Sequence, residues 1–75
     1  MIKITVNLFA SFRDGRFKKE QQEVPAGTTL RMAVAEIGIA ETEIGMALVN
    51  SIHAPMEQVL SDGDILYLSP WIGGG

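Results

Sequence analysis

The sequence predicts an α+β fold in which one helix lies across a mixed β-sheet. Strand-like apolar patterns occupy both ends of the chain, and a single stretch between them has helical spacing. With 75 residues and no cysteine, the chain has room for one domain with a small core that no disulfide supports. We expect residues 1–70 to form this domain and residues 71–75 to form a flexible C-terminal tail.

The first strand is predicted over residues 2–8, where apolar and polar residues alternate. Residues 17–24 are polar and weakly patterned, and we expect a short antiparallel partner at a sheet edge. Lys18 and Lys19 would discourage that edge from pairing with another chain.

The helix is predicted to begin after the Pro25-Ala26-Gly27 break, with Thr28 or Thr29 as its N-cap. Its apolar stripe has the i, i+3, i+4, i+7 spacing and consists of Leu30, Ala33, Val34 and Ile37. Gly38 suits the left-handed position after the last turn, and Ile39 could make the accompanying apolar contact.

The second half supplies two more strands. Residues 46–49 form a continuous apolar run, and residues 65–68 form the last strand after a turn at residues 61–64. Residues 52–60 are ambiguous, since Pro55 argues against a central strand. If the first and last strands pair in the middle of the sheet, they run parallel, and the tail leaves from the most buried strand.

The charges are divided unevenly along the chain. All six basic residues lie in the first 31 positions, whereas residues 32–75 carry six acidic residues and no basic one. The acidic residues 32–75 would be attracted to a basic partner and repelled by nucleic acid. A solvated acidic face explains the uneven charge distribution equally well. With no cysteine and His53 as the single histidine, we expect no metal site. No segment resembles a signal peptide or a membrane span, so we expect a soluble, cytoplasmic protein.

The last residues carry the main functional hypothesis. Three glycines, Gly73 to Gly75, follow Pro70, Trp71 and Ile72. A thread without Cβ atoms can enter a narrow slot in another protein and, if extended, reaches about 16 Å beyond Pro70. We therefore consider the carboxylate of Gly75 the functional group; a frayed end or an expression scar is the ordinary explanation of a bare Gly-Gly-Gly.

In order along the chain, several short segments match one known family. The chain resembles the ubiquitin-like β-grasp sulfur carriers, above all the small subunit of molybdopterin synthase (MoaD-like), and also the thiamine-pathway carrier ThiS. The matching segments are residues 8–13, 24–29, 49–50, 60–64 and 69–75. The third terminal glycine, Trp71 and the Ser51 that follows Asn50 depart from the usual family pattern.

The resemblance implies a carrier that binds no cofactor and is not itself an enzyme. A ubiquitin-activating-like adenylyltransferase would use ATP to adenylate Gly75, and sulfur would then replace AMP to give a thiocarboxylate, with Gly74 part of the reacting end. The sulfur would go to a molybdopterin synthase large subunit or to another sulfur acceptor enzyme. Partner contacts are assigned to Pro70, Trp71, Ile72, Gly73, Phe9 and Arg13.

The alternative function is a ubiquitin-like interaction or conjugation module without thiocarboxylate chemistry. Some of the residues also have two interpretations. Trp71 could anchor a partner or fold back onto the sheet, and we favour the partner. For Phe9 and Phe12, core packing is favoured over recognition. Arg13 could contact the partner or bind carbonyl groups of its own chain, and the sequence does not separate these.

Overall fold

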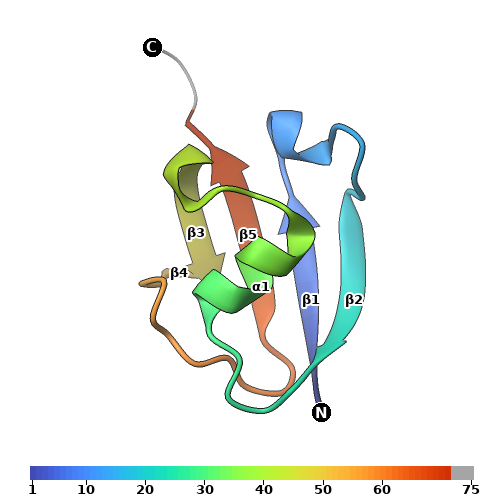
Figure 1. Ribbon diagram of the computed structural model, residues 1–75, viewed down its shortest axis with the longest axis vertical. Helices are drawn as coiled ribbons and strands as arrows, with labels where there is room; N and C mark the ends of the chain where they lie inside the picture. Colours follow the sequence, from blue (N-terminus) through green and yellow to red (C-terminus); the bar gives the residue numbers. More distant parts are fainter. Residues whose placement is uncertain (72–75) are drawn as a thin grey trace.

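The computed structural model describes residues 1–71, which form a five-stranded mixed sheet with one α-helix across one face (Figure 1). The strands and the helix are β1 (Ile2–Leu8), β2 (Lys19–Val24), α1 (Leu30–Ile37), β3 (Ile44–Val49), β4 (Ile52–His53) and β5 (Ile65–Pro70). Two single turns of 3-10 helix, η1 (Ala10–Arg13) and η2 (Glu41–Glu43), connect them. The predicted α+β arrangement is confirmed.

The strand that leads to the tail lies in the middle of the sheet. The strand order is β2-β1-β5-β3-β4, and β1 and β5 run parallel with Leu8 opposite Leu68. β2 pairs antiparallel with β1, and β3 pairs antiparallel with β5. The structure thus confirms the parallel central pair and the edge position of β2 (Figure 1).

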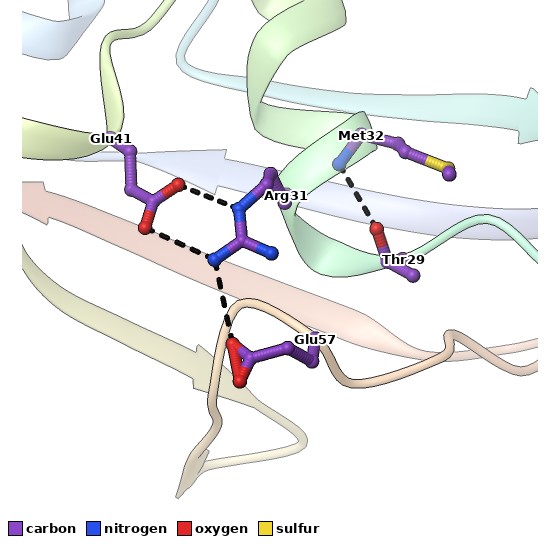
Figure 2. Close-up of polar contacts among 5 residues, drawn as sticks. All are labelled: Thr29, Arg31, Met32, Glu41 and Glu57. Carbon is purple, nitrogen blue, oxygen red and sulfur yellow. Dashed lines mark hydrogen bonds and ion pairs between the residues drawn. The ribbon is translucent and has the colours of Figure 1, made fainter.

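Side chains and backbone cap both ends of α1. Thr29 is the N-cap: its Oγ1 accepts a hydrogen bond of 3.3 Å from the Met32 N–H (Figure 2). At the other end Gly38 has φ 89°, a left-handed conformation that costs glycine little. The Ile39 N–H donates to the Val34 carbonyl at 3.2 Å, and the Ile39 side chain is buried. Both predicted caps are therefore confirmed, with Thr29 rather than Thr28 at the N-terminus.

The core lies between the sheet and the helix. The fully buried large side chains come from β1, α1 and β5, and are Ile4, Leu8, Leu30, Leu66, Leu68, Val6 and Val34. Burial of each such side chain contributes about 1.5–3 kcal/mol relative to its exposure. Because β5 supplies two of them, the strand that precedes the tail is firmly anchored.

Several boundaries differ from the sequence pattern, and β2 begins at Lys19 rather than at residue 17. β3 begins at Ile44 rather than Met46, β5 extends to Pro70, and the ambiguous stretch contributes the two-residue edge strand β4. A register irregularity between Ile44 and Met46 interrupts the pairing of β3 with β5. Proline is tolerated at Pro70 because it lies beside this irregularity, where the hydrogen-bond ladder is already interrupted.

Candidate functional site

The chain emerges from the protein at the end of β5. Ser69 is 5% exposed, whereas Trp71 is 75% exposed. The change from a buried strand to an exposed side chain therefore takes two residues. Trp71 does not pack on the sheet, so the fold-back alternative is wrong, and its role as a partner contact stays a prediction.

Gly45 makes room for this exit. It lies in the irregular part of β3, beside the Ile44–Pro70 pair. A Cβ at this position would lie 2.8 Å from the carbonyl oxygen of Pro70 and 2.9 Å from the Cα of Trp71. Any larger residue would push the departing chain away from β3. Gly45 thus positions the chain at Pro70 and Trp71, and no pattern in the sequence indicates this role.

Phe9, Tyr67 and Arg13 form a cluster beside the exit. The Phe9 and Tyr67 rings are stacked, with centroids 6.1 Å apart and an interplanar angle of 22°. The guanidinium carbon of Arg13 lies 5.4 Å from the Phe9 ring centroid, and its Nε donates to the Leu8 carbonyl at 2.7 Å. Arg13 therefore binds a carbonyl of its own chain and also lies over Phe9, while its role toward a partner stays a prediction.

The two phenylalanines occupy different environments. Phe12 belongs to the buried core, as the sequence analysis favoured. Phe9 does not: it is half-buried and stacks on Tyr67, which alternates along β5 with the buried Leu66 and Leu68. Side chains on either side of a strand alternate, so Phe9 and Tyr67 lie on the face of the sheet away from α1.

The same outer face is apolar around β3 and β5. Strand pairing puts Leu48 opposite Tyr67 and Met46 opposite Ser69. We define the outer patch as Phe9, Met46, Leu48, Ile65 and Tyr67, of which Met46 is 36% and Ile65 39% exposed. Next to it, the outer positions of β1 and β2 are polar. An apolar patch bordered by polar residues is typical of a docking surface.

A hydrogen-bonded pair fixes the beginning of β5. Asn50 donates from Nδ2 to Asp64 Oδ1 at 2.8 Å, and its Oδ1 accepts from the Ile65 N–H at 2.9 Å. Asp64 is 8% exposed and also accepts from the Ser61 N–H at 2.7 Å. The sequence predicts a turn at Asp64, and Asn50 was noted only in a segment that matches the family. Their pairing spans two separate turns, so no local pattern indicated it.

Arg31 connects α1 with two loops. Its guanidinium makes two hydrogen bonds to the Glu41 carboxylate, at 2.8 and 3.3 Å, and reaches Glu57 at 3.5 Å (Figure 2). The hydrogen bond from Arg31 lowers the pKa of Glu41, and the same bond raises the pKa of Arg31. Both side chains of the closer pair are about half exposed, which limits its stabilising effect.

The remaining predicted site residues lie outside the described part of the chain. These are Ile72, Gly73, Gly74 and Gly75. Within residues 1–71, no group of three or more acidic or histidine side chains is arranged to hold a metal ion. The same residues contain no helix that is long and apolar enough to cross a bilayer.

Comparisons with solved structures agree on the fold. A candidate molybdopterin converting factor, subunit 1, from Pyrococcus furiosus superposes with a TM-score of 0.80 at 25% identity, over 96% of this chain and 100% of that one. Small archaeal modifier protein 1 of Haloferax volcanii superposes with a TM-score of 0.79 at 19% identity, over 96% of this chain and 100% of that one. Urm1 from Trypanosoma brucei superposes with a TM-score of 0.71 at 24% identity, over 97% of this chain and 95% of that one.

A comparison with curated proteins found no match. The model of the ThiS family, by contrast, matches residues 6–75, which is nearly the whole chain and includes the terminal glycines. The chain therefore belongs to the ThiS family and has the ubiquitin-like β-grasp fold of the sulfur carriers.

Proposed function

We propose that this protein is a sulfur carrier that transports sulfur as a thiocarboxylate on Gly75. One observation carries the proposal: the buried central strand β5 leads within two residues to the exposed Trp71, four residues before Gly75. The family match through residue 75 supports it. In this proposal the reacting group is the carboxylate of Gly75 and the partner supplies the catalysis, so the chain acts as a carrier and not as an enzyme.

The proposed chemistry has two steps. A partner enzyme catalyses attack of the Gly75 carboxylate on the α-phosphorus of ATP, which gives an acyl-adenylate and releases pyrophosphate. Hydrosulfide, or a sulfur donor equivalent to it, then attacks the carbonyl carbon; AMP leaves, and a thiocarboxylate remains. Glycine favours both steps because it has no side chain to hinder approach to the carbonyl. ATP is bound by the partner, and this chain requires no cofactor of its own.

We expect the activating partner, a ubiquitin-activating-like adenylyltransferase, to bind the outer patch together with Arg13 and Trp71. The patch lies beside the end of β5, so an enzyme that covers it would receive the tail directly. The acidic second half of the sequence supports a partner with basic groups around its apolar surface. We expect the reaction to occur in the cytoplasm, where ATP is available to the activating enzyme.

The proposed destination of the sulfur is molybdopterin synthesis or a related pathway, through a molybdopterin synthase large subunit or another acceptor enzyme. The similarity to a molybdopterin converting factor subunit from Pyrococcus furiosus supports the first. The Haloferax volcanii protein is named a modifier, which keeps protein conjugation as the alternative use of the same terminus.

The test is ATP–pyrophosphate exchange with the adenylating enzyme of the same host. We expect the full chain to support exchange and a chain that ends at Gly73 to support none, with both chains unfolding at the same urea concentration. Equal exchange by the two chains would overturn the proposal. An Ile52→Ala variant is the matched folding control, since Ile52 is exposed on the edge strand β4, outside the outer patch.

A further inference from the structure

We propose that a groove between β2 and α1 binds an extended, basic segment of a partner protein by strand addition. The groove has a volume of about 310 Å³ and includes Val24, Ala33 and Met32 in its lining. That volume lies at the lower end of the range for ligand pockets, about 300–1,000 Å³. It suits one or two apolar side chains better than a large cofactor. Met32 is 58% exposed, and its unbranched side chain adapts to different occupants.

The backbone beside this groove is unpaired. The Leu8 N–H donates to the Lys18 carbonyl at 2.9 Å, and hydrogen bonds in an antiparallel pair recur at every second residue. The N–H and C=O groups of Gln21 and Glu23 therefore point away from β1. Among residues 1–71 no strand pairs with β2 on that side. An extended segment could bond to these groups while it directs alternate side chains into the groove.

Charge indicates which segment fits. Glu23 and Glu36 line the groove, and Glu20 lies on the same strand. The ion pairs within residues 1–71 are those of Arg31 with Glu41 and Glu57, so none of these three carboxylates forms an ion pair there; Lys3, opposite Glu23 on β1, is the nearest cation in the strand register. Lysine or arginine between apolar residues would complement them, and acidic segments would be repelled. Lys18 and Lys19 restrict pairing to the later part of β2.

The groove is remote from the point where the chain leaves β5. Val24 lies opposite Ile2, at the start of β1, whereas β5 passes Leu8 at the other end of that strand. Six residues along a strand correspond to about 20 Å. Figure 1 shows the end of β2 and the exit of β5 at opposite ends of the sheet. A segment in the groove would therefore not cover the end of β5, so this binding is independent of the proposed sulfur chemistry.

The test is an NMR titration of the ¹⁵N-labelled full chain with the peptide acetyl-Lys-Val-Lys-Leu-Lys-Val-Lys-amide at low salt. We expect amide shifts to change at residues 21–25 and 32–36, and a chain that ends at Trp71 to give the same result. The same peptide with glutamate in place of lysine should not bind. Changes confined to the outer patch, or equal binding of the glutamate peptide, would overturn the proposal.

Two sets of variants sharpen the test. The double substitution Glu23→Gln and Glu36→Gln should weaken binding about fivefold, as expected for two exposed charge pairs. Gln21→Pro removes an outward N–H from an edge strand, where proline is tolerated, and should abolish binding that Gln21→Thr retains. Unchanged affinity in the double variant would contradict the proposal. Equal binding by the Gln21→Pro and Gln21→Thr variants would also contradict the proposal. If the Gln21→Pro variant does not fold, the affinity of the Glu23→Gln, Glu36→Gln double variant is the deciding measurement.

Discussion

Gly45 and Pro70 approach each other so closely that an added Cβ on Gly45 would lie 2.8 Å from the Pro70 carbonyl oxygen. The contact links the irregular part of β3 to the residue from which the chain leaves the sheet. The path of the chain at Pro70 and Trp71 is thus determined by a residue on a neighbouring strand as well as by β5 itself.

Gly45→Ala should destabilise the protein and redirect the chain at Trp71. Overpacking of this kind costs about 1–3 kcal/mol, because the backbone has to shift. Urea unfolding measures the loss, and the Trp71 amide and indole resonances report the shift. Gly15→Ala is the control: Gly15 has φ +69° and no atom within 4 Å of an added Cβ, so it should cost stability without moving Trp71. Unchanged Trp71 resonances in the Gly45 variant would contradict this account.

Asn50→Ala should cost about 1–3 kcal/mol of unfolding free energy, because it leaves the mostly buried Asp64 carboxylate and the Ile65 N–H without their amide partner. Asn50 also has φ 53°, so part of the loss is conformational. Asn50→Gly also removes the amide, but glycine readily adopts the positive φ. We expect its unfolding free energy, measured by chemical denaturation, to lie between those of the wild type and Asn50→Ala. A glycine variant as stable as wild type would show that the hydrogen bonds contribute nothing.

The stacked pair of Phe9 and Tyr67 should show a coupling energy of about 0.5–1.5 kcal/mol in a double-mutant cycle of alanine substitutions. Their centroid distance of 6.1 Å is within the range for interacting rings. Additive losses of stability would argue against the stacking contribution.

Phe9→Ala should also weaken binding of the activating enzyme about tenfold, as for an aromatic residue at the centre of an interface. Calorimetry or the KM of pyrophosphate exchange measures this effect. Ile52→Ala removes an apolar side chain that is 70% exposed outside the patch and should leave the affinity unchanged. If both variants bind equally well, the outer patch is not the docking surface.

The Arg31–Glu41 pair predicts a small dependence of stability on acid pH. Since the folded state lowers the pKa of Glu41, its contribution is present above the ordinary glutamate pKa of about 4.3 and is lost as pH falls through the lower, folded value. The pKa of Arg31 is raised in the folded state, so its contribution to stability is present below its ordinary pKa and would be lost only in strong alkali. Glu41→Gln should flatten the acid side of a stability–pH curve, and an unaltered curve would rule out the pair as its cause.

Patterns local in sequence predicted most of the fold. The alternation of residues 2–8, the apolar stripe from Leu30, and the Thr29 and Gly38 caps each depend on residues a few positions apart. The parallel orientation of the first and last strands was expected only on the condition that they pair in the middle of the sheet, and the structure shows that they do.

The parts of the site that could not be predicted from the sequence depend on contacts between residues far apart along the chain. Nothing near Gly45 in the sequence indicates that Pro70 passes against it, and nothing near Asn50 indicates that Asp64 will accept its amide. Likewise, Phe9 has the apolar character of a core residue, and only its stacking on Tyr67 reveals that it belongs to the outer face. The groove beside β2 could not be predicted because it forms only where the edge strand and α1 come together in the folded protein.

Intact-mass spectrometry of the protein purified from its own host tests the central claim most directly. We predict a chain that ends at Gly75 together with a second population, heavier by the difference between one sulfur atom and one oxygen atom, whose extra mass maps to the last residue. A chain that continues beyond Gly75, or one found only as the free carboxylate and as isopeptide-linked adducts on other proteins, would contradict the sulfur-carrier account.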